Sequence, residues 1–176
     1  MKELSAKLIL LLIDIIAIVL SITISYQLRV LFDDSFVSTF GHNLSLYLSF
    51  PLLYIATLST LAYEGIYTKR YDFWHESRQI IKALILSFIL VLAFLAMTKS
   101  IENYSRATIV FIFMSMTLLI PFFKIIIKKL LYHIGLWQRA ASVYSNDPFV
   151  TKEIFSNHYL GYIKANKEEA KTVFIN

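Results

Sequence analysis

The amino-acid sequence predicts a mainly α-helical membrane protein. A four-helix transmembrane bundle is expected in residues 1–136, followed by the incomplete start of a parallel α/β domain in residues 137–176. Hydrophobic residues make up 57% of the 176-residue chain and charged residues only 16%, whereas charged residues make up roughly a quarter of soluble domains. Long apolar runs dominate the first part, and short β-prone runs separated by turn residues follow.

Composition also narrows the classes of function. The chain contains no cysteine, which excludes disulfide bonds and thiolate metal sites. Its formal net charge is +5, but the basic residues flank the apolar runs and do not form one continuous stripe. Nucleic-acid binding requires such a basic surface. We therefore expect no nucleic-acid partner and interpret the positive charge as a topology signal.

The first predicted span is Leu8–Leu28, an apolar run of the length that a transmembrane helix needs, about 20 residues. A secretory signal peptide is the rival interpretation, because it also combines a basic start with an apolar run. Its apolar core is shorter, about 7–15 residues, and no small-residue cleavage site precedes Arg29. The sequence therefore favours a membrane helix.

Asp14 is an acidic residue inside this first span. Inserting a carboxylate at such a depth costs about 2.5–3.5 kcal/mol, so Asp14 should face other helices. Ser21 and Ser25 share its helical face, which predicts polar packing within the membrane and close approach of a neighbouring helix. A lipid-headgroup or proton-handling site at Asp14 is the alternative.

Three further spans are predicted at Leu44–Tyr63, Ile80–Thr98 and Ala107–Ile127. Pro51 lies near one end of the second span, where a kink removes few backbone hydrogen bonds. The segment between the first two spans, residues 30–43, is acidic and is expected to be external.

Most basic residues lie on the other side of the predicted spans. Basic residues concentrate in cytoplasmic segments of membrane proteins, so this distribution predicts a multi-pass protein with both termini in the cytoplasm. The expected cytoplasmic residues are Lys2, Lys7, Lys69, Arg70, Arg78, Lys82, Lys124, Lys128, Lys129 and Arg139, against Arg29, Lys99 and Arg106 outside.

Two amphipathic segments are expected at the cytoplasmic surface. One begins after the helix-capping residue Asp72 and leads into the third span, and the other follows Pro121 and ends at Gly135. Their basic residues are candidates for contact with lipid phosphates, the alternative being simple interfacial anchoring. These candidates, including two from the preceding loop, are Lys69, Arg70, Arg78, Lys128 and Lys129.

The last part of the chain has a strand–helix–strand–strand pattern. Strands are predicted at 141–144, 160–164 and 172–175, with a helix from Pro148 to about Asn157 and a helical or turn connection at 167–171. The turn at 145–148 lacks the glycines that let a backbone approach a pyrophosphate. We therefore expect no nucleotide cofactor there.

Several features resemble one family. Gly65-Ile66-Tyr67 with Arg70 and Glu76, Ser105-Arg106, and Ile134-Gly135-Leu136-Trp137 are similar to the N-terminal region of the large bacterial polyprenyl-phosphate hexose-1-phosphate transferases. The resemblance implies four helices and a Rossmann-like regulatory domain ahead of a catalytic domain. That domain uses an Asp-Glu dyad and magnesium to transfer sugar phosphate from a UDP-sugar to undecaprenyl phosphate.

None of these catalytic residues is expected in this chain. The resemblance therefore implies no catalytic, cofactor or metal residue here, and magnesium only in the catalytic domain. It predicts a membrane-anchoring and regulatory fragment of an enzyme that initiates O-antigen, capsule or exopolysaccharide synthesis. The expected setting is the bacterial inner membrane, with membrane lipid or polyprenyl phosphate and a second copy of the chain as partners.

Two alternatives remain. Membrane-bound nucleotide-sugar 4,6-dehydratases have a similar N-terminal layout, and a stand-alone small membrane protein that binds lipid or partner helices also fits the composition. The sequence after Lys171 reads as a buried strand without a cap or polar tail, which favours a truncated chain over a stand-alone protein.

Overall fold

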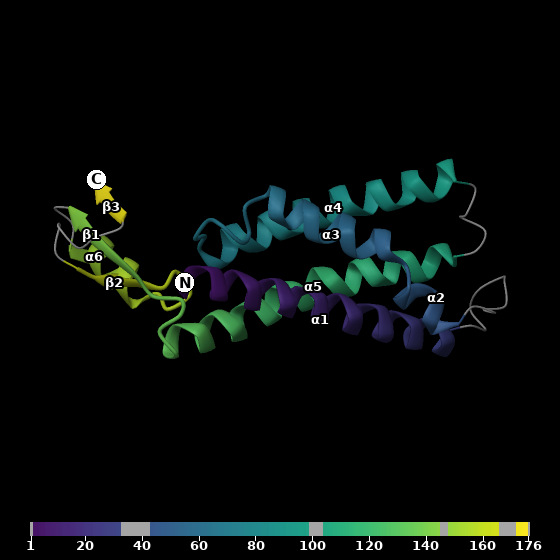
Figure 1. Ribbon diagram of the computed structural model, residues 1–176, viewed down its shortest axis with the longest axis horizontal. Helices are drawn as coiled ribbons and strands as arrows, with labels where there is room; N and C mark the ends of the chain where they lie inside the picture. Colours follow the sequence, from purple (N-terminus) through teal and green to yellow (C-terminus); the bar gives the residue numbers. More distant parts are fainter. Residues whose placement is uncertain (1, 33–42, 99–103, 145–147, 166–171, 176) are drawn as a thin grey trace.

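The computed structural model describes residues 2–32, 43–98, 104–144, 148–165 and 172–175. Long helices lie side by side, and a small sheet lies at the end of the bundle where the chain begins (Figure 1). The elements are α1 (Lys2–Leu31), α2 (Leu44–Leu48), α3 (Pro51–Tyr63), α4 (Phe73–Met97), α5 (Arg106–His133), β1 (Arg139–Tyr144), α6 (Pro148–Ser156), β2 (Tyr162–Lys164) and β3 (Thr172–Ile175).

Three of the described helices, α1, α4 and α5, are long and apolar enough to cross a membrane. They contain the first, third and fourth predicted spans. Their outer faces fit a lipid environment, because large apolar side chains recur on α1 at four-residue steps and are exposed. These are Leu4, Leu8, Leu12, Ile16, Leu20, Ile24 and Leu28.

The second predicted span is not one continuous helix. It is divided into α2 and the 13-residue α3, with Ser49 and Phe50 between them. Pro51 explains the break: proline has no N–H to donate, and it disfavours a helical conformation at the preceding residue. Phe50 is accordingly extended, with φ −87° and ψ 91°.

The two amphipathic segments, which the sequence analysis places at the membrane surface, are continuous with the long helices. They are the ends of α4 and α5, which continue to Phe73 and His133 respectively. The Asp72 carboxylate caps α4 by accepting the Trp74 N–H at 3.4 Å, and α4 contains no proline or glycine. Helix α5 continues through Pro121. The extra turns therefore extend each long helix.

The helices pack as two pairs, α1 with α5 and α3 with α4, and α4 joins the pairs by contacting α5. Small polar residues link the helices inside the bundle. Ser25 and Ser115 hydroxyls lie 3.0 Å apart between α1 and α5, and those of Thr57 and Ser87 lie 3.0 Å apart between α3 and α4. Such contacts allow close helix packing in a membrane.

The sheet is parallel, with strand order β2-β1-β3. Helix α6 connects β1 to β2, so the strands and the helix lie where the sequence predicts them. The turn at 145–147 and the connection at 167–171 lie outside the described residues. The expectation of no nucleotide site at this turn therefore stays a prediction.

Candidate functional site

A buried ionic cluster lies at the end of the bundle nearest the sheet. Asp14 of α1 accepts a hydrogen bond from the Lys124 ammonium of α5 at 2.7 Å and one from the Tyr67 hydroxyl at 2.6 Å. Both charged side chains are fully buried. Asp14 thus faces the bundle interior, where its carboxylate is neutralised by a residue 110 positions away in the sequence.

A second ion pair joins the Lys128 ammonium to the Glu76 carboxylate of α4. Lys128 lies one helical turn after Lys124, so both ammonium groups project from the same face of α5. The Lys128 nitrogen also lies 4.3 Å from the ring centroid of Tyr159 and 5.0 Å from that of Trp137. Such cation–π contacts are strongest where water is excluded.

These two pairs form a neutral cluster, because two carboxylates balance two ammonium groups. Breaking a buried pair by removing one partner costs about 3–5 kcal/mol, since an uncompensated charge remains. The cluster therefore holds α1, α4 and α5 in one arrangement. The sequence assigned Lys128 to lipid phosphates, whereas the structure buries it against Glu76 because α5 continues into the bundle core.

Arg70 connects the bundle to the α/β segment. Its Nη1 donates to the carbonyl oxygens of Trp137 at 2.9 Å, Leu160 at 2.9 Å and Gly161 at 3.1 Å. The guanidinium also lies 4.3 Å from the Trp137 ring centroid. Gly161 has φ +68°, and a Cβ there would overlap the Trp137 carbonyl oxygen. We call these contacts of Arg70 the Arg70 clamp.

Burial perturbs the ionisable groups around the cluster. It raises the pKa of the Tyr67 hydroxyl, and the adjacent Asp14 carboxylate raises it further. The pKa of Tyr159 is raised for the same reasons, by burial and then by Glu76. Both tyrosines therefore remain neutral and serve as hydrogen-bond donors. Burial lowers the pKa of Arg70, which loses hydration in the clamp.

The remaining predicted site residues lie apart from the cluster. The side chains of Lys69, Arg78 and Lys129 are exposed, so they are accessible to phosphate groups, and their lipid contact stays a prediction. Ser21 is buried and donates to the Ala17 carbonyl oxygen at 2.8 Å within α1. Ser25 is the residue that reaches α5.

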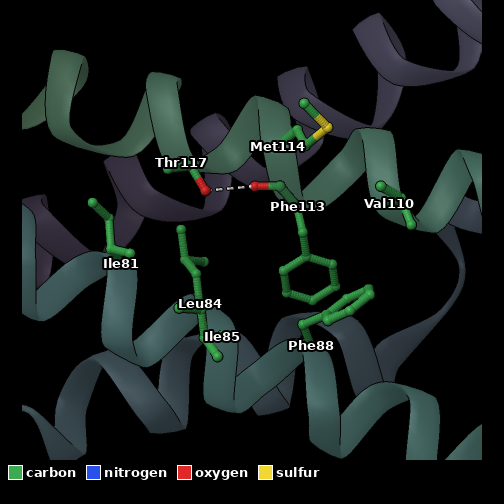
Figure 2. A pocket seen from close by; sticks show the side chains of 8 residues that line it. All are labelled: Ile81, Leu84, Ile85, Phe88, Val110, Phe113, Met114 and Thr117. Atoms are coloured by element: carbon green, nitrogen blue, oxygen red, sulfur yellow. Dashed lines mark hydrogen bonds between the residues drawn. The ribbon is translucent and has the colours of Figure 1, made fainter.

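An apolar groove of about 210 Å³ lies between α4 and α5 (Figure 2). Phe88 of α4 and Phe113 of α5 line it, with ring centroids 5.2 Å apart. Thr117 is the polar member of its lining, but its hydroxyl donates to the Phe113 carbonyl oxygen at 2.8 Å. The groove thus offers an apolar surface without a free polar group of its own.

Sequence reasoning did not identify Lys124, Tyr67, Trp137 and Tyr159 as parts of one cluster. A signal was present for the lysines: two charges one turn apart in an apolar helix indicate a shared buried face. No comparable signal identifies the aromatic partners, because they come from loops that are distant in the sequence.

Comparisons with known proteins give a partial similarity. No family model matches the chain. Over 73 residues, the chain is 36% identical to undecaprenyl-phosphate galactose phosphotransferase of Salmonella typhimurium (strain LT2). The match covers 42% of this chain and 15% of that protein's length. Together with the three helices of membrane-spanning length, this similarity indicates a membrane protein related at most distantly to that transferase.

Proposed function

We propose that this chain is the membrane-anchoring region of an undecaprenyl-phosphate sugar-1-phosphate transferase and that it holds an α/β segment at the membrane surface. In this proposal, residues 137–176 are regulatory, and the sugar-transfer residues with their magnesium belong to a catalytic domain outside this chain. Inner-membrane location, contact with polyprenyl phosphate, a role in polysaccharide synthesis and homo-oligomerisation belong to the same proposal.

The Arg70 clamp is the observation that carries it. A segment that only tethered a domain would need no fixed contact with it, whereas Arg70 donates to the carbonyl oxygens of Trp137 and Gly161, which lie just before β1 and β2 respectively. Lys128 contacts Trp137 and Tyr159 from within the bundle. These contacts support positioning of the α/β segment, and not merely its attachment.

Helix direction supports four crossings even though α3 is short. Figure 1 shows that α1 and α4 both begin at the end of the bundle next to the sheet, so they run in the same direction. The chain must therefore return between them, and α2 with α3 provides this return. With α5 running back, both termini lie on one side, which the distribution of basic residues makes cytoplasmic.

Single cysteines test this topology without background, because the chain has no cysteine. Asn43→Cys and Thr68→Cys lie at opposite ends of the α2–α3 return and are both exposed. We expect a membrane-impermeant maleimide added to intact spheroplasts to label position 43 and to label position 68 only after permeabilisation. Labelling of both positions from outside would show that the α2–α3 segment does not cross.

An activity assay tests the assignment of catalysis. The purified chain, supplied with UDP-galactose, magnesium and undecaprenyl phosphate, is expected to show no transfer of sugar phosphate. Transfer above the rate without protein would contradict the anchoring proposal, because it would place catalytic residues in this chain.

A further inference from the structure

A small polar pocket lies where the start of α1, the loop after α3 and the connection from α5 to β1 meet. Its volume is about 40 Å³, and its polar and aromatic lining comprises Glu3, Lys7, Tyr67, Thr68, Arg70, Trp137 and Arg139. It adjoins the ionic cluster through Tyr67, which lines the pocket and donates to Asp14, although Lys7 precedes Asp14 by about 10 Å along α1. We call it the junction pocket.

The junction pocket has an excess of positive charge. Three cations, Lys7, Arg70 and Arg139, line it with one acid, Glu3. The Arg139 Nε and the Glu3 carboxylate oxygen are 3.9 Å apart, which is too long for a hydrogen bond. This single acid pairs with the arginine electrostatically but leaves its Nε without a hydrogen-bond acceptor among the described residues.

Two of these cations, Arg139 and Lys7, also have N–H donors that could bind an anion. The buried Nε of Arg139 has no hydrogen-bond partner within the described part of the chain, and an unsatisfied buried donor is costly. Lys7 forms no ion pair with any residue that the structure describes. Burial lowers the pKa of Arg70, and the nearby positive charge of Arg139 also lowers it. An anion in the pocket would relieve all three conditions.

We propose that the junction pocket binds a phosphate group, carried either by an anionic lipid headgroup or by free inorganic phosphate. Its volume holds about three water molecules, which suits one phosphate group and excludes a sugar ring or a nucleobase. Arginine side chains bind phosphate oxygens through paired N–H donors, and lysine contributes a point charge. The lipid source rests on the proposed membrane anchoring, whereas phosphate binding itself does not.

Trp137 lines the pocket and provides the readout. The full chain, with Trp74→Phe to remove the other tryptophan, is titrated in neutral detergent with inorganic phosphate while Trp137 fluorescence is recorded. The second arm uses phosphatidylcholine nanodiscs with increasing phosphatidic acid. A response to inorganic phosphate assigns the free anion, and a response to phosphatidic acid alone assigns the headgroup. No saturable response in either arm overturns the proposal.

Single-residue variants distinguish a specific phosphate site from a general attraction of anions to a positively charged protein. Arg139→Gln and Lys7→Gln are each expected to weaken binding by roughly 10-fold or more, because each removes a charge-assisted contact. Arg78→Gln is the matched control, since it removes an exposed cation outside the pocket. Weakening by Arg78→Gln equal to that by Arg139→Gln would contradict the site.

Glu3→Gln is expected to change the phosphate affinity in the opposite direction, an effect that misfolding would not produce. It removes the only acid of the lining, so binding should become several-fold tighter through the loss of like-charge repulsion. Weaker or unchanged binding would contradict the proposal. These titrations are independent of the cysteine labelling and the transfer assay, so failure of phosphate binding and failure of the anchoring function are distinguishable.

Discussion

At the scale of single residues, the molecule is organised around charges that its helices bury. Burying either the Asp14 or the Glu76 carboxylate alone in an apolar bundle would cost too much free energy. Each is instead paired with a lysine from one face of α5. Buried pairs of this kind add little net stability compared with apolar residues, yet they penalise every arrangement that separates the partners. Their contribution is therefore to specify which helix faces meet.

Lys128→Met tests this penalty. The change leaves the Glu76 carboxylate buried without its cation, so the free energy of unfolding in mixed micelles should fall by about 3–5 kcal/mol. Lys129→Met, one position along, alters an exposed lysine and is the matched control. The double variant Glu76→Gln/Lys128→Met should recover much of the loss. A Lys128→Met effect no larger than that of Lys129→Met would mean that the pair is not buried.

The raised pKa of Tyr67 predicts that the stability of the fold decreases at alkaline pH. Burial and Asp14 raise its pKa in the folded chain above the ordinary value of about 10. Below pH 10 the hydroxyl is protonated in both states and the stability is fully present. Above pH 10 the unfolded chain releases this proton while the folded chain retains it, so stability falls as the pH rises.

Tyr67→Phe should therefore reduce the slope of unfolding free energy against pH between about pH 10 and 11, while costing about 1–3 kcal/mol at neutral pH through the lost hydrogen bond to Asp14. Tyr63→Phe, which changes a tyrosine with 82% exposure, is the control. Identical slopes for the two variants would show that Tyr67 is not the source of the pH dependence.

At the scale of elements, the α1–α5 pair depends on small residues along one face of α1. Ala17, Ser21 and Ser25 are buried there, whereas Ile16 and Leu20 are exposed. Ala17→Leu should overpack this interface and lower the unfolding free energy by about 1–3 kcal/mol. Ile16→Leu, on the exposed side, should change it by less than about 0.5 kcal/mol. Equal effects would indicate that the two faces have similar surroundings.

The long helices could be predicted from the sequence because their apolar runs exceed what a bilayer requires. The break before α3 could not, because proline in an apolar run is compatible with a kink as well as with an interruption. The start of α4 and the end of α5 were predicted to lie at the membrane surface, because charged residues at a helix end indicate an interface in a sequence. In the structure Lys124 pairs with Asp14 and Lys128 with Glu76, and these side chains are buried.

The candidate site was predictable only in part for the same reason. Asp14 in a span requires a polar partner, and the sequence predicts that it faces other helices. Which residue supplies the partner depends on the packing of α1 against α5, a contact between distant parts of the chain. Arg70 was predicted as a contact for lipid phosphates, whereas its Nη1 donates to carbonyl oxygens that lie 67 to 91 positions away in the sequence.

At the scale of the whole molecule, the question is whether the sheet and the bundle behave as one unit. Bundle and sheet meet through the Arg70 clamp, through Trp137, and through Asn157, whose side chain donates to the Asp72 carboxylate at 3.1 Å. All three carbonyl oxygens accept from one nitrogen, Nη1, and the guanidinium carbon lies 4.3 Å from the Trp137 ring centroid. Arg70→Lys keeps the charge but replaces the planar guanidinium with a compact ammonium on a shorter side chain, so the donor no longer reaches the same position.

Hydrogen–deuterium exchange measures the result. In Arg70→Lys, amides of β1 and β2 should exchange at least several-fold faster, because the carbonyls that flank these strands lose their shared donor. Amides in the apolar middle of α1 and α5 should be unchanged. Arg78→Lys, an exposed cation on α4, is the matched control. Unchanged exchange in β1 and β2 would show that the clamp does not hold the α/β segment. Faster exchange throughout the bundle would show that Arg70 supports the bundle itself, and not specifically its junction with the sheet.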